Sequence, residues 1–190
     1  MKRLLLTVAL VLLAGLMAAG QGFATGANSR NDARLEPLFE QLKAAKDPAV
    51  AQILEAQIWH IWTWTTTEDV NLLMRMGIGA MDRQDFEAAL LHFDEMVRIA
   101  PDFAEAWNKR ATVHYRQGNY RASVIDIEKV LEIEPKHFGA LSGLGLIYLQ
   151  LEQKKPALRA FEKALEIHPN MGNAKSVVKD LRRAVEGERT

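Results

Sequence analysis

The side chains in this sequence best suited to bind a metal or move a proton are five histidines, and their spacing favours neither role. They stand at positions 60, 92, 114, 137 and 168, so no two are four residues apart on one helix face, and no HExxH motif occurs. The chain also lacks cysteine, which excludes thiolate nucleophiles, cysteine zinc sites and disulfide bonds. We therefore expect surface or hydrogen-bonded histidines, with no metal and no other cofactor.

Two glycine pairs, Gly77 with Gly79 and Gly143 with Gly145, resemble the glycines of phosphate-binding loops. Both pairs fall inside segments with helical periodicity, and neither follows a strand, so we interpret them as glycines that allow close helix packing. The acidic side chains are typical of solvated helix faces, because paired catalytic carboxylates need a cleft that desolvates one of them. No serine stands in a nucleophile elbow. The sequence therefore predicts a protein that is not an enzyme.

The elements that carry these residues repeat every 34 positions. Pro101, Pro135 and Pro169 stand at this interval, and each closes a similar segment. Aligning the chain on these prolines brings small residues into two columns, which are Gly77, Ala111 and Gly145, and Ala89, Ser123 and Ala157. Small residues at a helix crossing let the backbones approach, and proline ends the second helix. The apolar spacing predicts hairpins over 69–82 with 85–99, 103–117 with 120–133, and 137–151 with 155–167. Gly118 falls in the middle turn, where glycine takes positive φ freely.

These columns resemble the tetratricopeptide repeat (TPR), a 34-residue helical hairpin with fixed small, aromatic and proline positions. The third repeat carries the likeness best, through Leu141, Gly145, Tyr148, Ala157, Phe161, Ala164 and Pro169. The second repeat departs from it at His114, Ile127 and Val130, and the first at Ala80 and Met96. The amino-acid sequences of residues 106–111 and 137–145 also resemble those of exported TPR proteins of the proteobacterial envelope. The resemblance covers about residues 70–171 and implies an all-α fold, an α-solenoid of TPR hairpins.

The repeats leave a flanking segment at each end of the chain. Residues 35–66 have the length of a hairpin without the small columns, and Asp47-Pro48 is a capped start for its second helix. We expect this N-terminal capping hairpin to cover the open apolar face of the first repeat. The full expected division is a signal peptide over 1–24, a disordered lead over 25–34, the capping hairpin over 35–66, TPR repeats over 69–102, 103–136 and 137–170, and a C-terminal capping helix over 171–187.

The first residues are typical of an export signal. Lys2 and Arg3 precede an unbroken apolar run from Leu4 to Ala19, and small residues then allow cleavage after Gly20 or Ala24. The alternative is an uncleaved segment that anchors the protein in the inner membrane, although its apolar core is somewhat shorter than the ~20 residues that span a bilayer. We expect a periplasmic protein with no stable membrane span after cleavage.

The TPR resemblance also implies where a partner binds. In the family, fixed positions of the first helix in each hairpin face a bound peptide. Carried onto this sequence, the peptide-binding groove comprises Asn71, Met74, Arg75, Ile78, Asn108, Lys109, Thr112, Tyr115, Arg116, Ser142 and Leu146. Arg75, Lys109 and Arg116 would form a basic strip along this groove. The carboxylate clamp of chaperone-binding relatives is not reproduced, because Met74 occupies one of its positions.

The expected partner is a protein or peptide segment, somewhat acidic or apolar, from an envelope protein. Removing residues 1–24 takes away two basic side chains and no acid, which leaves 22 basic against 24 acidic side chains and a formal charge of −2. This balance argues against nucleic acid as a partner. An alternative function is structural self-association into a homo-oligomer, through Trp64 and the terminal helices, without a client peptide. Trp59 and Trp62 share a helix face and are expected in the core.

Overall fold

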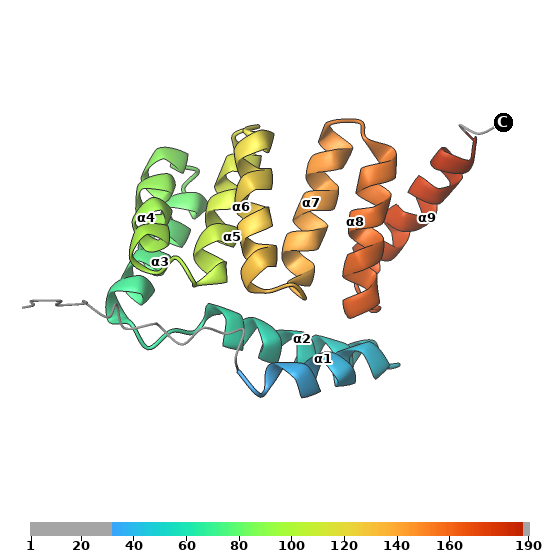
Figure 1. Cartoon of the computed structure of the whole chain (residues 1–190), viewed down its shortest axis with the longest axis horizontal. Coiled ribbons are helices and arrows are strands. Elements are labelled where there is room, and N and C mark those ends of the chain that lie inside the picture. The colour runs from blue at the N-terminus through green and yellow to red at the C-terminus, as the bar shows by residue number, and fades with distance from the viewer. Residues whose placement is uncertain (1–31, 188–190) are drawn as a thin grey trace, which may run out of the picture.

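The computed structural model describes residues 32–187, and the regular secondary structure in this part of the chain is all α-helix, without a strand. The helices are connected by short turns and lie in a row, with the N-terminal hairpin crossing below that row (Figure 1). Their bounds are α1 Leu35–Ala44, α2 Pro48–Thr63, α3 Glu68–Asp82, α4 Phe86–Ile99, α5 Ala104–Arg116, α6 Tyr120–Ile133, α7 Phe138–Gln150, α8 Lys154–Ile167 and α9 Gly172–Gly187. The expected all-α solenoid is confirmed, and the hairpin helices agree with the predicted ranges to within one or two residues.

The hairpins α3–α4, α5–α6 and α7–α8 are held by close crossings at the small-residue columns. A Cβ atom added to Gly77 would lie 2.5 Å from the Phe93 ring, and one added to Gly145 would lie 2.6 Å from the Phe161 ring. Both rings are buried, so each fills the space that the glycine leaves. In the middle hairpin, the Ser123 hydroxyl donates a hydrogen bond of 2.7 Å to the Ala111 carbonyl oxygen. The repeat therefore depends on a side chain of the second helix seated against the backbone of the first.

Each hairpin turns through one residue in the left-handed conformation, at the same position of the repeat. Gln84, Gly118 and Glu152 have φ of 60°, 76° and 57°, and they are 34 residues apart. The expectation for Gly118 is confirmed. A non-glycine residue in this conformation costs about 1 to 2 kcal/mol, so the packing of the first and third hairpins must offset a small backbone strain.

The N-terminal hairpin does not cover the first repeat, and that expectation is wrong. Phe39 of α1 and Trp62 of α2 instead share a core with Phe138, Leu141 and Ala164 of the third repeat. In Figure 1, α1 and α2 cross below the row of helices, under its C-terminal half. The contact is largely aromatic, because the Trp62 ring of α2 packs on Phe138 at the start of α7 with ring centroids 5.0 Å apart, and burial of large apolar side chains stabilises this placement.

Polar contacts fix the N-terminal hairpin in this position. The Asn170 amide nitrogen donates to the Ala45 carbonyl oxygen at 2.7 Å, and Lys136 Nζ lies 2.6 Å from a Glu36 carboxylate oxygen. His168 Nε2 lies 3.1 Å from Glu55 Oε2 of α2. These contacts join residues about a hundred positions apart, so a sequence pattern of local period cannot reveal them.

The tryptophans lie where their spacing predicts. Trp62 is buried, Trp59 packs partly buried beside it with ring centroids 5.2 Å apart, and Trp64 at the end of α2 is exposed. At the other end of the chain, α9 packs on α8 through Ala174, Val178 and Leu181. Within residues 32–187 no helix is both long and apolar enough to cross a membrane. The expected signal peptide and most of the expected disordered lead lie outside the described residues.

The close crossing in the third hairpin generates a stability test. Gly145→Ala would place a methyl group 2.6 Å from the Phe161 ring, whereas Gly143→Ala in the same helix would meet Ile127 at an ordinary 3.6 Å. Both changes gain about 1 kcal/mol of helix propensity, but overpacking costs Gly145→Ala about 1 to 3 kcal/mol. We expect urea unfolding to show the Gly145 variant about 2 kcal/mol less stable than the Gly143 variant. Equal stabilities would contradict the crossing as described.

Candidate functional site

The inner surface of the helix row contains a cavity of about 320 Å³ between α5, α6 and α7. Its wall combines neutral polar side chains, apolar side chains and a single charged one, Arg116. The lining residues are Asn108, Ala111, Thr112, Tyr115, Arg116, Ser123, Ile127, Gly139, Ser142, Gly143, Leu146 and Ile147. Gly139 and Gly143 contribute no side chains, so part of the wall is backbone.

A second cavity, of about 480 Å³, continues the first toward the C-terminal helix. The two share Ser142 and Leu146, and the second is also lined by Met171 and Val177. We call the two together the inner groove. The Glu55 and His168 pair lies at its edge, so the N-terminal hairpin forms part of its wall.

The structure brings most of the predicted groove residues of the second and third repeats to the inner groove. Those that line its first cavity are Asn108, Thr112, Tyr115, Arg116, Ser142 and Leu146. The predicted residues of the first repeat do not line it. Arg75 and Ile78 are exposed on α3, and the Asn71 amide nitrogen donates to the Thr65 carbonyl oxygen at 2.9 Å.

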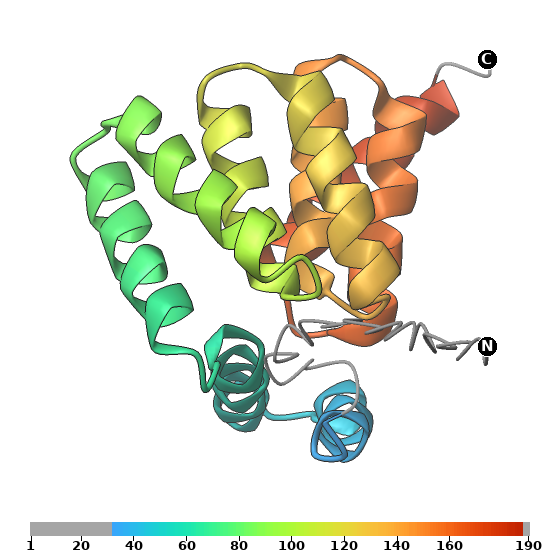
Figure 2. The same cartoon turned by 60° about the vertical axis from the view of Figure 1, so that its left-hand side comes forward.

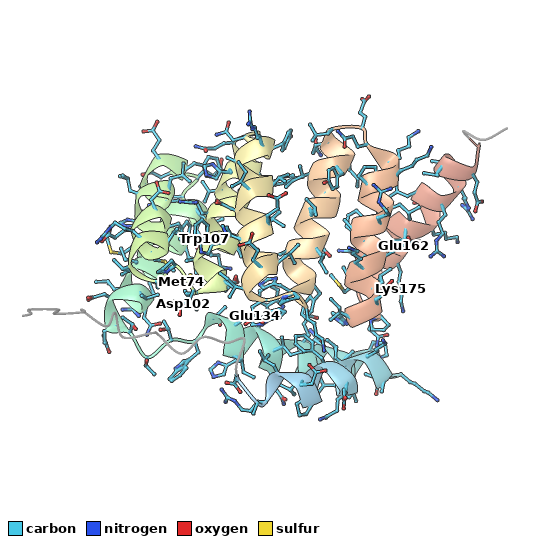
Figure 3. All side chains as sticks on the ribbon, viewed as in Figure 1. Met74, Asp102, Trp107, Glu134, Glu162 and Lys175 are labelled. Atoms are coloured by element: carbon cyan, nitrogen blue, oxygen red, sulfur yellow. The ribbon has the colours of Figure 1, made fainter. Side chains whose placement is uncertain are left out.

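The TPR resemblance places Met74 in the groove, but its side chain is only 8% exposed and belongs to the core of the first repeat. Figure 3 labels it among the helices of that repeat. Because Met74 packs against neighbours of α4 and α5, it offers almost no surface to a ligand. The position also cannot hold the lysine of a carboxylate clamp without burying a charge.

Helix α2 closes one end of the groove. A Cβ atom added to Gly139 would lie 2.8 Å from the Trp59 ring, so the indole rests on the α7 backbone. Trp62 stacks on the His137 ring, with centroids 4.1 Å apart and planes 9° from parallel. Ala104, Glu105 and Ala106 at the start of α5 and Phe138 at the start of α7 are buried, so a partner can reach only the part of the inner surface beyond them.

A buried polar cluster lies under this cover. Glu105 and His137 are fully buried, with His137 Nε2 and Glu105 Oε2 3.7 Å apart. His137 Nδ1 accepts a hydrogen bond of 3.0 Å from the Ala140 amide, so a neutral ring holds its proton on Nε2, facing the carboxylate. The Asn108 amide nitrogen donates to Glu105 Oε2 at 2.6 Å, and Lys109 Nζ lies 3.5 Å from Oε1.

This cluster changes the roles expected of two groove residues. Lys109 is partnered with a buried carboxylate, so it is not a free cation for a ligand. Asn108 uses its amide hydrogen on Glu105 and presents its carbonyl oxygen as the group left for a peptide. Of the expected basic strip, Arg116 is the member that lines the first cavity.

The same cluster determines the acidity of Glu105. Burial raises the pKa of its carboxyl, whereas His137, the charge of Lys109 and the Asn108 amide lower it. The lowering contributions win, and the pKa of Glu105 lies below its ordinary value. The ionised carboxylate is therefore part of the folded state, in spite of its burial.

Arg110 connects helices in the middle of the row and lines neither cavity of the inner groove. Its guanidinium donates to both oxygens of Asp126 in α6, at 2.9 and 2.6 Å, and to Asp94 in α4 at 2.7 Å. The bidentate pair fixes the angle of the arginine as well as its position. Because Arg110 joins α4, α5 and α6, it sets how the first repeat lies on the second.

The comparisons with known proteins agree with this geometry. A family model described as tetratricopeptide repeat matches residues 102–170. A TPR repeat-containing protein of Rhizobium etli is 40% identical over 164 residues, which cover 86% of this chain and 80% of that protein. This chain belongs to the tetratricopeptide repeat family.

Solved TPR structures share the fold. The crystal structure of the Sgt2 TPR domain from Aspergillus fumigatus superposes with a TM-score of 0.60 at 26% identity, covering 65% of this TPR chain and 84% of that one. The first TPR of Spaghetti (RPAP3) bound to an HSP90 peptide gives a TM-score of 0.60 at 17% identity, covering 63% and 94%. The latter likeness shows the fold alone.

Sequence reasoning missed the residues through which the N-terminal hairpin shapes the site. Glu55 and Trp59 of α2 border the inner groove, and Glu105 lies buried beneath it. The repeat pattern aligns positions within the repeats, but it carries no information about α2, which lies outside the repeats and packs on the third one. Among residues 32–187, no group of three or more histidine, aspartate or glutamate side chains could hold a metal ion.

The lowered pKa of Glu105 generates a pH test. An acid whose pKa falls on folding contributes stability that is fully present above its unfolded pKa, about 4.3, and is lost as the pH falls through the folded value. The contribution that depends on ionisation is absent in Glu105→Gln. We expect the difference in unfolding free energy between the native protein and this variant to be largest from pH 5 to 7 and to shrink toward pH 3, as measured by urea titrations.

A gap between the two proteins that stays constant over this pH range would show that the Glu105 charge is not part of the folded cluster. Glu128→Gln is the matched control, because Glu128 is exposed on α6, and it should unfold in parallel with the native protein at every pH.

Proposed function

We propose that this TPR protein is a non-enzymatic adaptor that holds a peptide segment of an envelope protein in the inner groove. The TPR is a protein-interaction module, and the composition of the inner groove supports the proposal that this protein binds a peptide segment there. Its first cavity combines an apolar floor, neutral hydrogen-bonding groups and one cation, and no histidine, aspartate, glutamate or lysine lines it. This composition suits a peptide better than a reaction that needs proton transfer.

The lining also indicates what kind of segment fits. Ile127, Leu146 and Ile147 surround space next to Gly143, where an apolar side chain can be buried. Arg116 at the end of α5 can pair with a carboxylate, from an acidic side chain or a chain terminus. The Asn108 carbonyl oxygen can accept a hydrogen bond from a peptide N–H. The expected ligand is therefore an apolar segment with a negative charge close by.

The structural neighbours support peptide binding as a use of this fold. Two are described as complexes, the first TPR of Spaghetti (RPAP3) with an HSP90 peptide and the second TPR domain of human RPAP3 with an HSP70 peptide. Because this chain lacks the clamp lysine at Met74 and pairs Lys109 internally, we propose a different class of client. The basic start and apolar run at residues 2–19 support an envelope protein met in the periplasm.

Capture from the groove tests the proposal. A photoactivatable amino acid at Leu146, which lines both cavities, should cross-link a specific protein in the cells that make this chain. The same probe at Leu91 is the control, since that residue is 71% exposed on α4 and outside the groove. Arg116→Glu should reduce capture from Leu146 at least about tenfold, roughly 1.4 kcal/mol, with unchanged helicity. Equal capture from both positions would remove the inner groove from the mechanism.

Export is tested separately. If the first residues are a cleaved signal, we expect the protein in the periplasmic fraction, with an N-terminus after Gly20 or Ala24, as read by N-terminal sequencing. Replacing Leu10 and Leu12 by arginine should keep the chain in the cytoplasm, because it breaks the apolar run. Recovery of a chain that begins at Met1 from the membrane fraction would instead support the anchored alternative.

A further inference from the structure

Helix α3 carries an exposed stripe that the peptide groove does not use. Its members are Asp69, Leu72, Met76, Gly79 and Arg83, at intervals of three and four residues, so they share one face of the helix. Leu72 is 48% exposed and Met76 is 45% exposed, so the two form a continuous apolar patch on the helix surface. The stripe is not part of either cavity of the inner groove.

The repeat itself shows what this face is built for. In the second repeat, Ala106 and Val113 stand at the positions of Leu72 and Gly79, and both are buried in one core with Met96 and Val97 of α4. In the third repeat, Ala140 and Ile147 stand there, buried with Ile127 and Val130 of α6. The position therefore receives a helix of the preceding repeat wherever a preceding repeat exists.

The first repeat has no preceding repeat, and the N-terminal hairpin packs on the third repeat instead. Figure 2 shows α3 at the free end of the row, with no helix on its outward side. The exposed stripe on α3 is thus a helix-binding face without a bound helix. It lies at one end of the solenoid, and α9 lies at the other end (Figure 2).

We propose that a second copy of this chain covers the stripe, with the two α3 helices antiparallel about a two-fold axis at Met76. The order of the residues is self-complementary in this arrangement. Met76 meets Met76 of the second copy at the centre, Leu72 lies over Gly79, and Asp69 faces Arg83 at each end. In a two-fold symmetric contact, both copies use the same surface, so each residue of the stripe must match the residue that lies opposite it on the antiparallel helix.

Two details of the structure favour a second copy over another helix. An added Cβ at Gly79 would meet only the Arg83 guanidinium, at 3.5 Å, so the surface there is open to the Leu72 side chain of a partner. Asp69 and Arg83 have no ion-pair partner in the part of the chain that the structure describes. Their opposite charges at the two ends of the stripe match when the helices run antiparallel, and they repel when the helices run parallel.

The contact involves one helix from each copy, so it is small, and the dimer is reversible at moderate concentration. Its surface is separate from the inner groove, and each copy keeps its groove free to bind a peptide. Dimerisation would therefore bring two bound segments together and raise the avidity for a partner that presents two copies of the segment.

A charge exchange tests the proposal. Sedimentation of the purified protein, up to about 0.5 mM for a weak contact, should show a mass that rises toward that of a dimer. Asp69→Arg alone and Arg83→Asp alone each place like charges in contact twice, so each should raise the concentration needed for dimerisation at least about tenfold. The double variant Asp69→Arg with Arg83→Asp restores both pairs and should dimerise like the native protein.

Cross-linking gives a second measurement, because the chain has no cysteine of its own. Met76→Cys should form covalent dimers with a short bis-maleimide, whereas Leu91→Cys on α4 should not, although Leu91 is the more exposed of the two residues, at 71% against 45%. Circular dichroism confirms that each variant is folded. A native protein that stays monomeric throughout, a dimer that both single charge variants leave intact, or a double variant as weak as the single ones would overturn the proposal, and capture of another protein at α3 would name a different occupant.

Discussion

The structure depends on how closely the two helices of each hairpin cross. In the first and third hairpins, a glycine receives a phenylalanine ring from the second helix at a distance that no Cβ atom would allow. In the middle hairpin, Ala111 and Ser123 meet instead, and the serine hydroxyl bonds the alanine carbonyl. A close crossing fixes the angle between the helices, and the repeated angle curves the row so that α5 and α7 form an inner surface. The inner groove therefore depends on these contacts.

The N-terminal hairpin then decides how much of that surface a partner can reach. Trp59 rests on Gly139 and Trp62 stacks on His137 at the start of α7, and His137 and the neighbouring Glu105 are fully buried. A buried carboxylate needs compensation, which Lys109 and Asn108 supply. Two side chains that would otherwise face a ligand are thereby committed to the fold. The accessible groove is shorter and more neutral than the repeats alone would make it.

The placement of the hairpin also explains the two ends of the solenoid. A solenoid repeat with one uncovered apolar face is normally closed by a capping element. Here α9 closes the C-terminal end, with Ala174, Val178 and Leu181 against α8 and charged residues outside. The N-terminal hairpin packs on the third repeat and does not close the other end, so Leu72 and Met76 remain exposed. The packing of the N-terminal hairpin on the third repeat therefore determines both the shape of the inner groove and the exposure of α3.

The sequence by itself determined the features that repeat or depend on neighbours along the chain. Pro101, Pro135 and Pro169 gave the period, the small columns gave the crossings, and helical spacing placed the tryptophans. These signals are local, because a helix end or a crossing position depends on residues within one hairpin. Only the tertiary structure decided where α1 and α2 lie, that Met74 is core, and that Lys109 serves Glu105. The place of α1 and α2 depends on contacts between segments about a hundred residues apart, which leave no periodic trace in the chain. The roles of Met74 and Lys109 depend on how neighbouring helices bury their side chains, and the repeat period does not encode that either.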